Sequence, residues 1–168
     1  MAVIDVGGRV RQGEELDVQA ITEWLIQNGN NVESPVEVTQ YSGGASNWTY
    51  RLKYANADLI LRRPPQGTKA KSAHDMAREY HVQKALAGYY PVVPEMVALC
   101  QDESVIGCDF YVMKRIEGII PRAKMPPELQ LTESDIRTLC INMIDKLIEL
   151  HQVPYTGTEL EKLGNAEG

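Results

Sequence analysis

The stretch YSGGASNWTYRLKYANADLILRRPP, from Tyr41 to Pro65, decides the fold. It begins with a Gly-Gly pair between serines and continues into two β-rich segments, Trp48–Tyr54 and Leu59–Arg63, which a short turn separates. β-Branched and aromatic residues favour strands, so the sequence predicts a glycine-containing loop followed by a hairpin. The two prolines that follow end the second strand, because proline has no N–H to donate to a sheet.

The Gly-Gly loop is a candidate phosphate-binding element. Glycine has no Cβ, so the backbone N–H groups of Gly43 and Gly44 can approach a phosphate closely. The side chains of Ser42, Ser46 and Asn47 can donate further hydrogen bonds to the phosphate oxygens. The alternative is a tight hairpin turn in which the glycines serve only the backbone geometry, and a Gly-Gly pair alone does not decide between the two.

Two charged residues are predicted to meet beneath this loop. Side chains alternate along a strand, so Ile60 and Arg62 share one face and Arg62 points under the loop. Ser72–Leu86 has a helical composition, and at 100° per residue Glu79 falls on its apolar stripe with no basic residue three or four positions away. We therefore expect Glu79 to pair with Arg62; the alternatives are pairing with Arg63 or a lysine, or exposure of Glu79 to solvent.

The composition is that of an ordinary soluble protein. Of the 168 residues, 43% are hydrophobic and 24% charged, and the formal net charge is -6. A net negative charge provides no general attraction for nucleic acid or an anionic membrane surface, and no apolar run reaches the roughly 20 residues of a membrane span. We expect a cytoplasmic protein with no nucleic-acid or membrane partner. The cysteines lack metal-binding spacing and are expected to be reduced packing residues: Cys100, Cys108 and Cys140.

The remaining elements follow from periodicity and turn residues. A helix is predicted after an N-cap at Asp17, preceded by a flexible lead-in over residues 1–15. Three further segments are predicted as strands: Val36–Tyr41, Met96–Cys100 and Phe110–Ile116. Prolines in 119–131 indicate a linker between lobes, and a helix over 132–153, capped by Thr132 or Ser134, precedes a polar tail over 154–168.

This last helix is expected to need an apolar partner. Its apolar residues recur at i, i+3 and i+4 spacing: Ile136, Leu139, Cys140, Met143, Ile144, Leu147 and Leu150. Leaving these side chains in water would forfeit roughly 1.5–3 kcal/mol for each large one. Unless the helix folds back on the preceding lobe, we expect self-association through residues 132–150.

The order of these elements and the motifs within them resemble a known family. YSGGASNWTYRL, LILRRPPQG, AHDMAREYHVQKAL and DESVIGCDFYVMKRIEG are similar to the aminoglycoside phosphotransferase-like family, and most similar to its branch of phosphotransferase domains fused to acyl-CoA dehydrogenases. The resemblance spans about residues 16 to 154. It implies an α+β protein-kinase-like fold: a smaller lobe over 16–118 with an antiparallel sheet and an αC-type helix, then the hinge and first helix of a truncated second lobe.

The resemblance also implies a nucleotide site for ATP, with GTP as the alternative. The residues it assigns to that site are Ser42, Gly43, Gly44, Ser46, Asn47, Ile60, Arg62, Glu79, Met113, Lys114 and Ile116. Arg62 stands where kinases have a lysine that holds the α- and β-phosphates, and Glu79 stands where their orienting glutamate lies. Met113 precedes the hinge, where the backbone C=O of Lys114 and N–H of Ile116 would bond to adenine.

The family's catalytic loop is not found in this sequence. The second lobe of the family carries H-G-D-x-x-x-x-N, whose Asp accepts the substrate hydroxyl proton and whose Asn holds Mg²⁺, but the histidines here begin no such loop: His74, His81 and His151. We expect the catalytic Asp and the Mg²⁺ ligands in a missing lobe, and this chain alone to be inactive. The substrate would be a small hydroxyl-bearing molecule, and the resemblance favours a hydroxyacyl-CoA.

Two alternatives to a phosphotransferase remain open. One is a pseudokinase or protein-interaction module without phosphotransfer. The other is an unrelated small α+β domain, which predicts no ion pair between Arg62 and Glu79.

Overall fold

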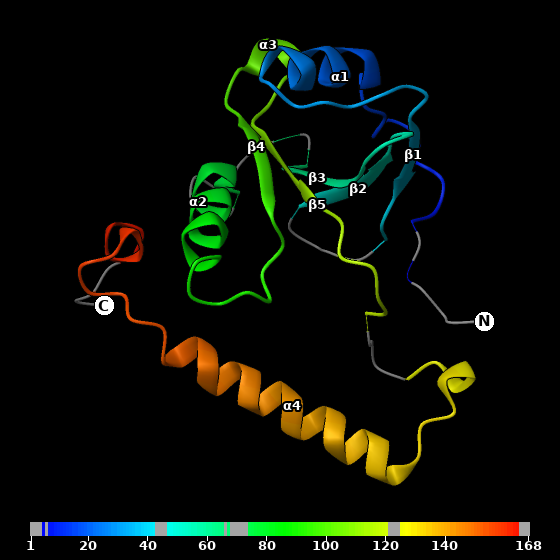
Figure 1. Cartoon of the computed structure of the whole chain (residues 1–168). Coiled ribbons are helices and arrows are strands. Elements are labelled where there is room, and N and C mark those ends of the chain that lie inside the picture. Colours follow the sequence, from blue (N-terminus) through cyan, green and yellow to red (C-terminus); the bar gives the residue numbers. More distant parts are fainter. Residues whose placement is uncertain are drawn as a thin grey trace.

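A computed structural model describes residues 5, 7–42, 47–65, 67, 74–120 and 125–164. Its elements are α1 (Val18–Gln27), β1 (Glu37–Gln40), β2 (Trp48–Lys53), β3 (Asp58–Arg63), α2 (Met76–Leu86), β4 (Met96–Cys100), α3 (Glu103–Ile106), β5 (Phe110–Lys114), η1 (Pro127–Leu129), α4 (Glu133–His151) and η2 (Glu159–Lys162) (Figure 1). The predicted α+β class is confirmed. The predicted phosphate loop, residues 43–46, lies outside the described residues.

The five strands form one antiparallel sheet in the order β1-β2-β3-β5-β4. The predicted hairpin is β2 and β3, in which Thr49 lies opposite Arg62 and Tyr50 opposite Leu61. β5 then pairs with the other edge of β3, which places Tyr111 opposite Arg62. All five predicted strands are present, and β3, with the Ile60–Arg62 face, is the central one.

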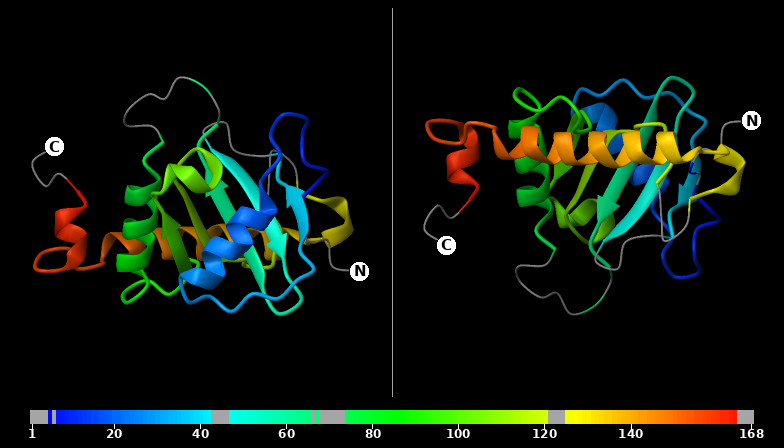
Figure 2. Two further views of the ribbon diagram at one scale, coloured as in Figure 1. Left: turned by 90° about the horizontal axis from the view of Figure 1, so that it is seen from above. Right: turned by 90° about the horizontal axis from the view of Figure 1, so that it is seen from below.

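The two faces of the sheet carry separate apolar clusters. On one face, Ile21 and Leu25 of α1 pack against Leu61 and Phe110, all completely buried. On the other face, α2 packs Met76 and Tyr80 against Tyr111. Figure 2 shows α1 lying across the sheet when the molecule is seen from above. Because residues alternate along β3, Leu61 joins the α1 core and its neighbours Ile60 and Arg62 face the α2 side.

The helices α1, α2 and α3 begin at acidic caps. Asp17 caps α1, as predicted, by accepting a hydrogen bond from the N–H of Ala20. Asp75 caps α2 by accepting from the N–H of Arg78, so this helix begins at Met76, four residues later than the predicted Ser72. The short helix α3 lies between β4 and β5; Asp102 caps it, and it ends at Gly107, whose φ is +80°. Four residues are too few to show a helical period in the sequence.

The described part of the N-terminal lead-in packs on the sheet, whereas the sequence predicted a flexible segment. Gly8 pairs with Gln40 of β1 through two backbone hydrogen bonds of 2.8 and 2.9 Å. The Glu14 carbonyl accepts from the Tyr50 hydroxyl at 2.7 Å, and a Cβ added at Gly7 would lie 2.6 Å from Oγ1 of Thr39. The prediction of flexibility was made from composition, and composition gives no information on whether a segment pairs with an edge strand.

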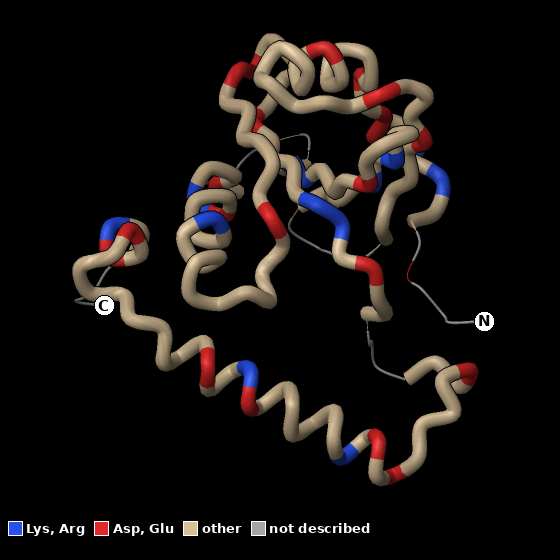
Figure 3. The backbone as a smooth tube through the Cα atoms, in the orientation of Figure 1, with Lys and Arg blue, Asp and Glu red and all other residues tan. Residues whose placement is uncertain are grey.

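The helix α4 stands apart from the sheet (Figure 1). It begins with a capping box between Thr132 and Asp135, so of the two predicted caps, Thr132 and Ser134, Thr132 is the one used. None of its residues is buried, and Met143 is 65% exposed. Cys140, predicted as a packing residue, is exposed, because no element covers this face, while Cys100 and Cys108 are buried as predicted. Figure 3 shows no charged residue along the middle of α4.

Among the described residues, a hydrogen bond links α4 to the lobe: the Tyr90 hydroxyl donates to the carbonyl of Lys146 at 3.0 Å. Within the part of the chain that the structure describes, no helix has both the length and the apolar character to cross a lipid bilayer.

Candidate functional site

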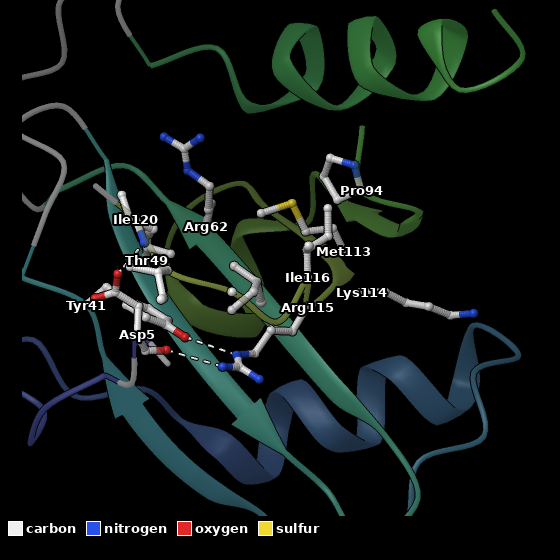
Figure 4. Close-up of a pocket in the computed structure, with 13 residues that line it drawn as sticks. Asp5, Tyr41, Thr49, Arg62, Pro94, Met113, Lys114, Arg115, Ile116 and Ile120 are labelled. Atoms are coloured by element: carbon white, nitrogen blue, oxygen red, sulfur yellow. Dashed lines mark hydrogen bonds between the residues drawn. The ribbon is translucent and has the colours of Figure 1, made fainter. Parts of the chain in front are cut away.

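A pocket of about 580 Å³ opens between the α2-side face of the sheet and the segment after β5, residues 115–120, which we call the connector (Figure 4). Its lining comes from β2, β3 and β5, from the residues just after β1 and just before β4, from the connector and from the N-terminal segment: Asp5, Tyr41, Thr49, Ile60, Arg62, Pro94, Met113, Lys114, Arg115, Ile116, Gly118, Ile119 and Ile120. About half of these residues have apolar side chains and the others bring polar or charged groups into the same pocket, a combination typical of a small-molecule site.

Five of the predicted site residues line this pocket: Ile60, Arg62, Met113, Lys114 and Ile116. The sheet register explains why strand residues far apart in sequence meet there. Thr49 lies opposite Arg62 across β2 and β3, and Met113 lies opposite Ile60 across β3 and β5. The result is an apolar floor with a guanidinium at one side. Ser42 is exposed and does not line the pocket.

The predicted ion pair between Arg62 and Glu79 is confirmed. Nη1 of Arg62 lies 3.3 Å from Oε2 of Glu79, and the two side chains are 29% and 31% exposed. The Tyr111 hydroxyl donates to the same Glu79 oxygen at 3.0 Å and accepts from Nη1 of Arg62 at 3.3 Å. Nε2 of Gln83 donates to this hydroxyl as well. Arg62 is therefore held in a network with three other side chains: Glu79, Tyr111 and Gln83.

The Tyr111 hydroxyl keeps its proton in this network. Burial raises the pKa of Tyr111, and the nearby Glu79 carboxylate adds to the rise while Arg62 opposes it. A protonated hydroxyl can donate to Glu79. Nothing in the local sequence around Tyr111 indicated this role, because it follows from the register that places β5 beside β3.

Asn47 has a different position from the one predicted. The sequence indicated a phosphate-facing side chain, but Asn47 is 2% exposed, and its Nδ2 donates to Oε1 of Glu79 at 2.7 Å. Its Oδ1 lies 2.9 Å from Nδ1 of His74. A partly buried carboxylate needs a donor for each oxygen, and Asn47 supplies the second one. Both oxygens of Glu79 are thus fixed, one by Asn47 and the other by Arg62 and Tyr111.

The connector after β5 is anchored by a buried arginine. The Arg115 side chain is 4% exposed; it donates to the Tyr41 hydroxyl and to Oδ2 of Asp58, both at 3.2 Å. Asp58 also accepts two hydrogen bonds of 2.7 Å from Arg51, and these bonds lower the pKa of Asp58 below its usual value. The backbone N–H of Ile116, the predicted adenine donor, has no hydrogen-bond partner in the described chain.

Asp5 joins the N-terminal segment to this connector. Its N–H donates to the carbonyl of Gly118 at 2.9 Å, and its carboxylate accepts from the N–H of Ile120. The sequence did not indicate a role for Asp5 or Arg115 in this site. Asp5 lies in a segment without periodicity, and Arg115 is one residue of a polar run.

Over the described residues there is no group of three or more His, Cys, Asp or Glu side chains that could hold a metal ion. The pocket offers the guanidinium of Arg62, an apolar floor and the backbone N–H of Ile116. These groups suit an anionic ligand with a flat apolar part.

Known proteins resemble this chain in both sequence and structure. Residues 37–167 match the model of the phosphotransferase enzyme family, APH. The chain is 38% identical to acyl-CoA dehydrogenase family member 11 of Gallus gallus over 79% of its length and 17% of that protein, and 35% identical to member 10 of Mus musculus over 81% of its length and 12% of that protein. It thus spans less than a fifth of these two relatives.

A solved structure agrees with this match. The crystal structure of a Ralstonia eutropha protein assigned as an aminoglycoside phosphotransferase superposes with a TM-score of 0.68 at 31% identity, covering 90% of this chain and 43% of that one. The fold of this chain is therefore protein-kinase-like. This chain belongs to the APH phosphotransferase family.

Proposed function

We propose that this chain is the nucleotide-binding lobe of an ATP-dependent phosphotransferase acting on a small-molecule hydroxyl. The observation that carries the proposal is Arg62, fixed by Glu79 at one side of a pocket whose other wall is the connector after β5. Family membership supports the phosphoryl-transfer class. ATP is the proposed donor, and GTP is the alternative.

The chemistry of the pocket suits a nucleoside triphosphate. Ile60 and Met113 offer an apolar surface for a flat base. The N–H of Ile116, which has no partner among the described residues, offers a donor to a ring nitrogen. The guanidinium of Arg62 would neutralise phosphate charge. Glu79 would not touch the phosphates; it would orient Arg62, since its own two oxygens are already occupied.

The proposal assigns the catalytic Asp and the Mg²⁺ ligands to residues outside this sequence. Mg²⁺ would neutralise the charge of the transferring phosphoryl group. The described residues provide no cluster to hold it. Phosphoryl transfer depends on positioning and charge neutralisation, so we expect the isolated chain to show no turnover with ATP, Mg²⁺ and hydroxylated substrates. Clear phosphate transfer by this chain would contradict the assignment.

The acceptor is proposed from the relatives. Because members 10 and 11 are acyl-CoA dehydrogenase family proteins, a hydroxyacyl-CoA is the favoured acceptor. We also propose a cytoplasmic location, which agrees with the finding that none of the three cysteines forms a disulfide bond.

Nucleotide binding is tested by titrating the chain with ATP and with adenosine, followed by NMR chemical shifts. We expect Arg62→Ala to weaken ATP binding by about 10-fold or more, the usual effect of removing one charge-assisted hydrogen bond, and to leave adenosine binding unchanged. Arg78→Ala is the matched control: it removes the same charge from an exposed position on α2 that does not line the pocket. Absence of ATP binding, or equal ATP affinity of the Arg62→Ala chain, would overturn the proposal.

The exposed apolar face of α4 favours a second candidate, a protein-interaction module. In that case a partner would cover α4, and nucleotide would be dispensable. The same titration separates the two candidates, because only the first requires ATP to perturb residues of the pocket.

A further inference from the structure

The pocket contains one acidic side chain among the lining residues that the structure describes, and it comes from the N-terminal segment. That residue is Asp5; the charged residues that share the lining with it are basic: Arg62, Lys114 and Arg115. A carboxylate inside a site proposed for a triphosphate requires an explanation, because it repels phosphate.

Asp5 is held firmly at this position. Its N–H donates to the carbonyl of Gly118, its C=O accepts from Nη2 of Arg115 at 3.2 Å, and its Oδ2 accepts from the N–H of Ile120. Three residues further along the chain, Gly8 pairs with β1. The N-terminal segment is therefore fastened at two places, to the sheet edge and to the connector, and it forms a wall of the pocket.

One oxygen of the Asp5 carboxylate remains available. Oδ2 is used by Ile120, whereas Oδ1 has no hydrogen-bond partner in the described chain. The neighbouring guanidinium of Arg115 does not neutralise it, since its contacts are the Asp5 carbonyl, the Tyr41 hydroxyl and the carboxylates of Asp58 and Glu117. An ionised oxygen at a pocket wall is a strong acceptor, so the matching ligand group is a hydrogen-bond donor.

The position of Asp5 identifies which donor this is. Figure 4 places Asp5 beside Tyr41 and Arg115, away from Arg62. In the proposed binding mode the phosphates lie at Arg62 and the base at the connector. In any nucleoside triphosphate the sugar links the base to the phosphates, and a ribose presents two adjacent hydroxyl groups that can both donate to one carboxylate.

We propose that Asp5 binds the ribose hydroxyls of the nucleotide and makes the pocket selective for ribonucleotides over deoxyribonucleotides. This inference rests on the proposed nucleotide-binding function. It gives the N-terminal segment a role in ligand recognition that its composition does not indicate.

The test compares ATP with 2′,3′-dideoxy-ATP, titrated against the whole 168-residue chain and its variants. The wild-type chain should bind ATP about 10- to 100-fold more tightly, the usual range for a hydrogen bond to a charged group. Asp5→Asn keeps an oxygen for the N–H of Ile120 but replaces the free oxygen by an amide nitrogen, so it should lose most of this preference. Binding of dideoxy-ATP should not weaken, because the variant removes no contact to that ligand and lowers the repulsion of its phosphates.

Glu128→Gln is the matched control, because Glu128 is an exposed carboxylate on η1 and does not line the pocket. It should keep the wild-type preference for ATP. The amide resonance of Ile120 reports whether Asp5→Asn leaves the N-terminal segment in place, and Asp5→Ala provides a second variant that removes both oxygens.

Three outcomes would count against the inference. Equal binding of ATP and dideoxy-ATP by the wild-type chain overturns the ribose contact while the proposed nucleotide function stands. Equal weakening of both nucleotides by Asp5→Asn assigns Asp5 a structural role only. Absence of binding by either nucleotide overturns the proposed function together with the inference.

Discussion

Replacing Tyr111 by phenylalanine removes one oxygen atom at the point where the sheet, α2 and the pocket meet. That oxygen donates to Glu79 and accepts from Arg62 and Gln83, and the Tyr111 ring is completely buried. A hydrogen bond to a charged group contributes about 1.5–3 kcal/mol, but Glu79 and Arg62 are partly exposed and remain paired, so we expect about 1–2 kcal/mol of lost stability.

The matched control is Tyr54→Phe. Tyr54 is 4% exposed, and its hydroxyl has a single neutral partner, Oγ1 of Thr22, at 2.9 Å on the α1 side of the sheet. Thr22 also donates to the carbonyl of Val18, so it keeps a hydrogen bond in the variant. Loss of this neutral bond should cost about 1 kcal/mol or less.

Urea unfolding followed by circular dichroism measures both free energies of unfolding, and an unchanged m value shows that the two variants can be compared. Nucleotide titration adds a second readout. With one donor to Glu79 removed, Arg62 is less well oriented, so Tyr111→Phe should weaken ATP binding by about fivefold, equivalent to about 1 kcal/mol. Tyr54→Phe should leave ATP binding unchanged. Equal costs in stability, or equal losses of ATP affinity, would refute the reasoning.

Three further predictions concern other parts of the chain. The pKa of Asp58 is lowered in the folded protein, so the ionised carboxylate stabilises the fold fully above the unfolded pKa of about 3.9, and this stabilisation is lost as the pH falls through the folded pKa. The free energy of unfolding should therefore decrease when the pH is lowered below about 4. The decrease should be smaller in Asp58→Asn. Gly7→Val should detach the N-terminal segment, because its Cβ would meet Thr39, and expose that segment to proteolysis, whereas Gly8→Ala should be tolerated. The chain should self-associate through α4, as sedimentation velocity would detect, and Met143→Glu should yield monomer without loss of stability, since Met143 is already exposed.

Local sequence determined the elements and the central ion pair of this protein. Alternation along β3 placed Arg62 on one face, and the helical period placed Glu79 among apolar neighbours without a local basic partner. A carboxylate in that position is expected to pair with a cation from another element, and periodicity favoured Arg62 over the other candidates. The Asp17 cap of α1 likewise depends on residues three positions apart.

Only the tertiary structure decided what surrounds that pair. Asn47 and Tyr111 reach Glu79 from positions 32 residues away on either side, and Arg115 reaches the carbonyl of Asp5 across 110 residues. Such contacts depend on which strands pair, and in which register, and neither is encoded in a local pattern. Local patterns in the sequence were thus enough to predict the strand with Arg62 and the helix with Glu79. The packing of distant segments set which side chains hold these two charged groups in place and which side chains form the wall of the pocket.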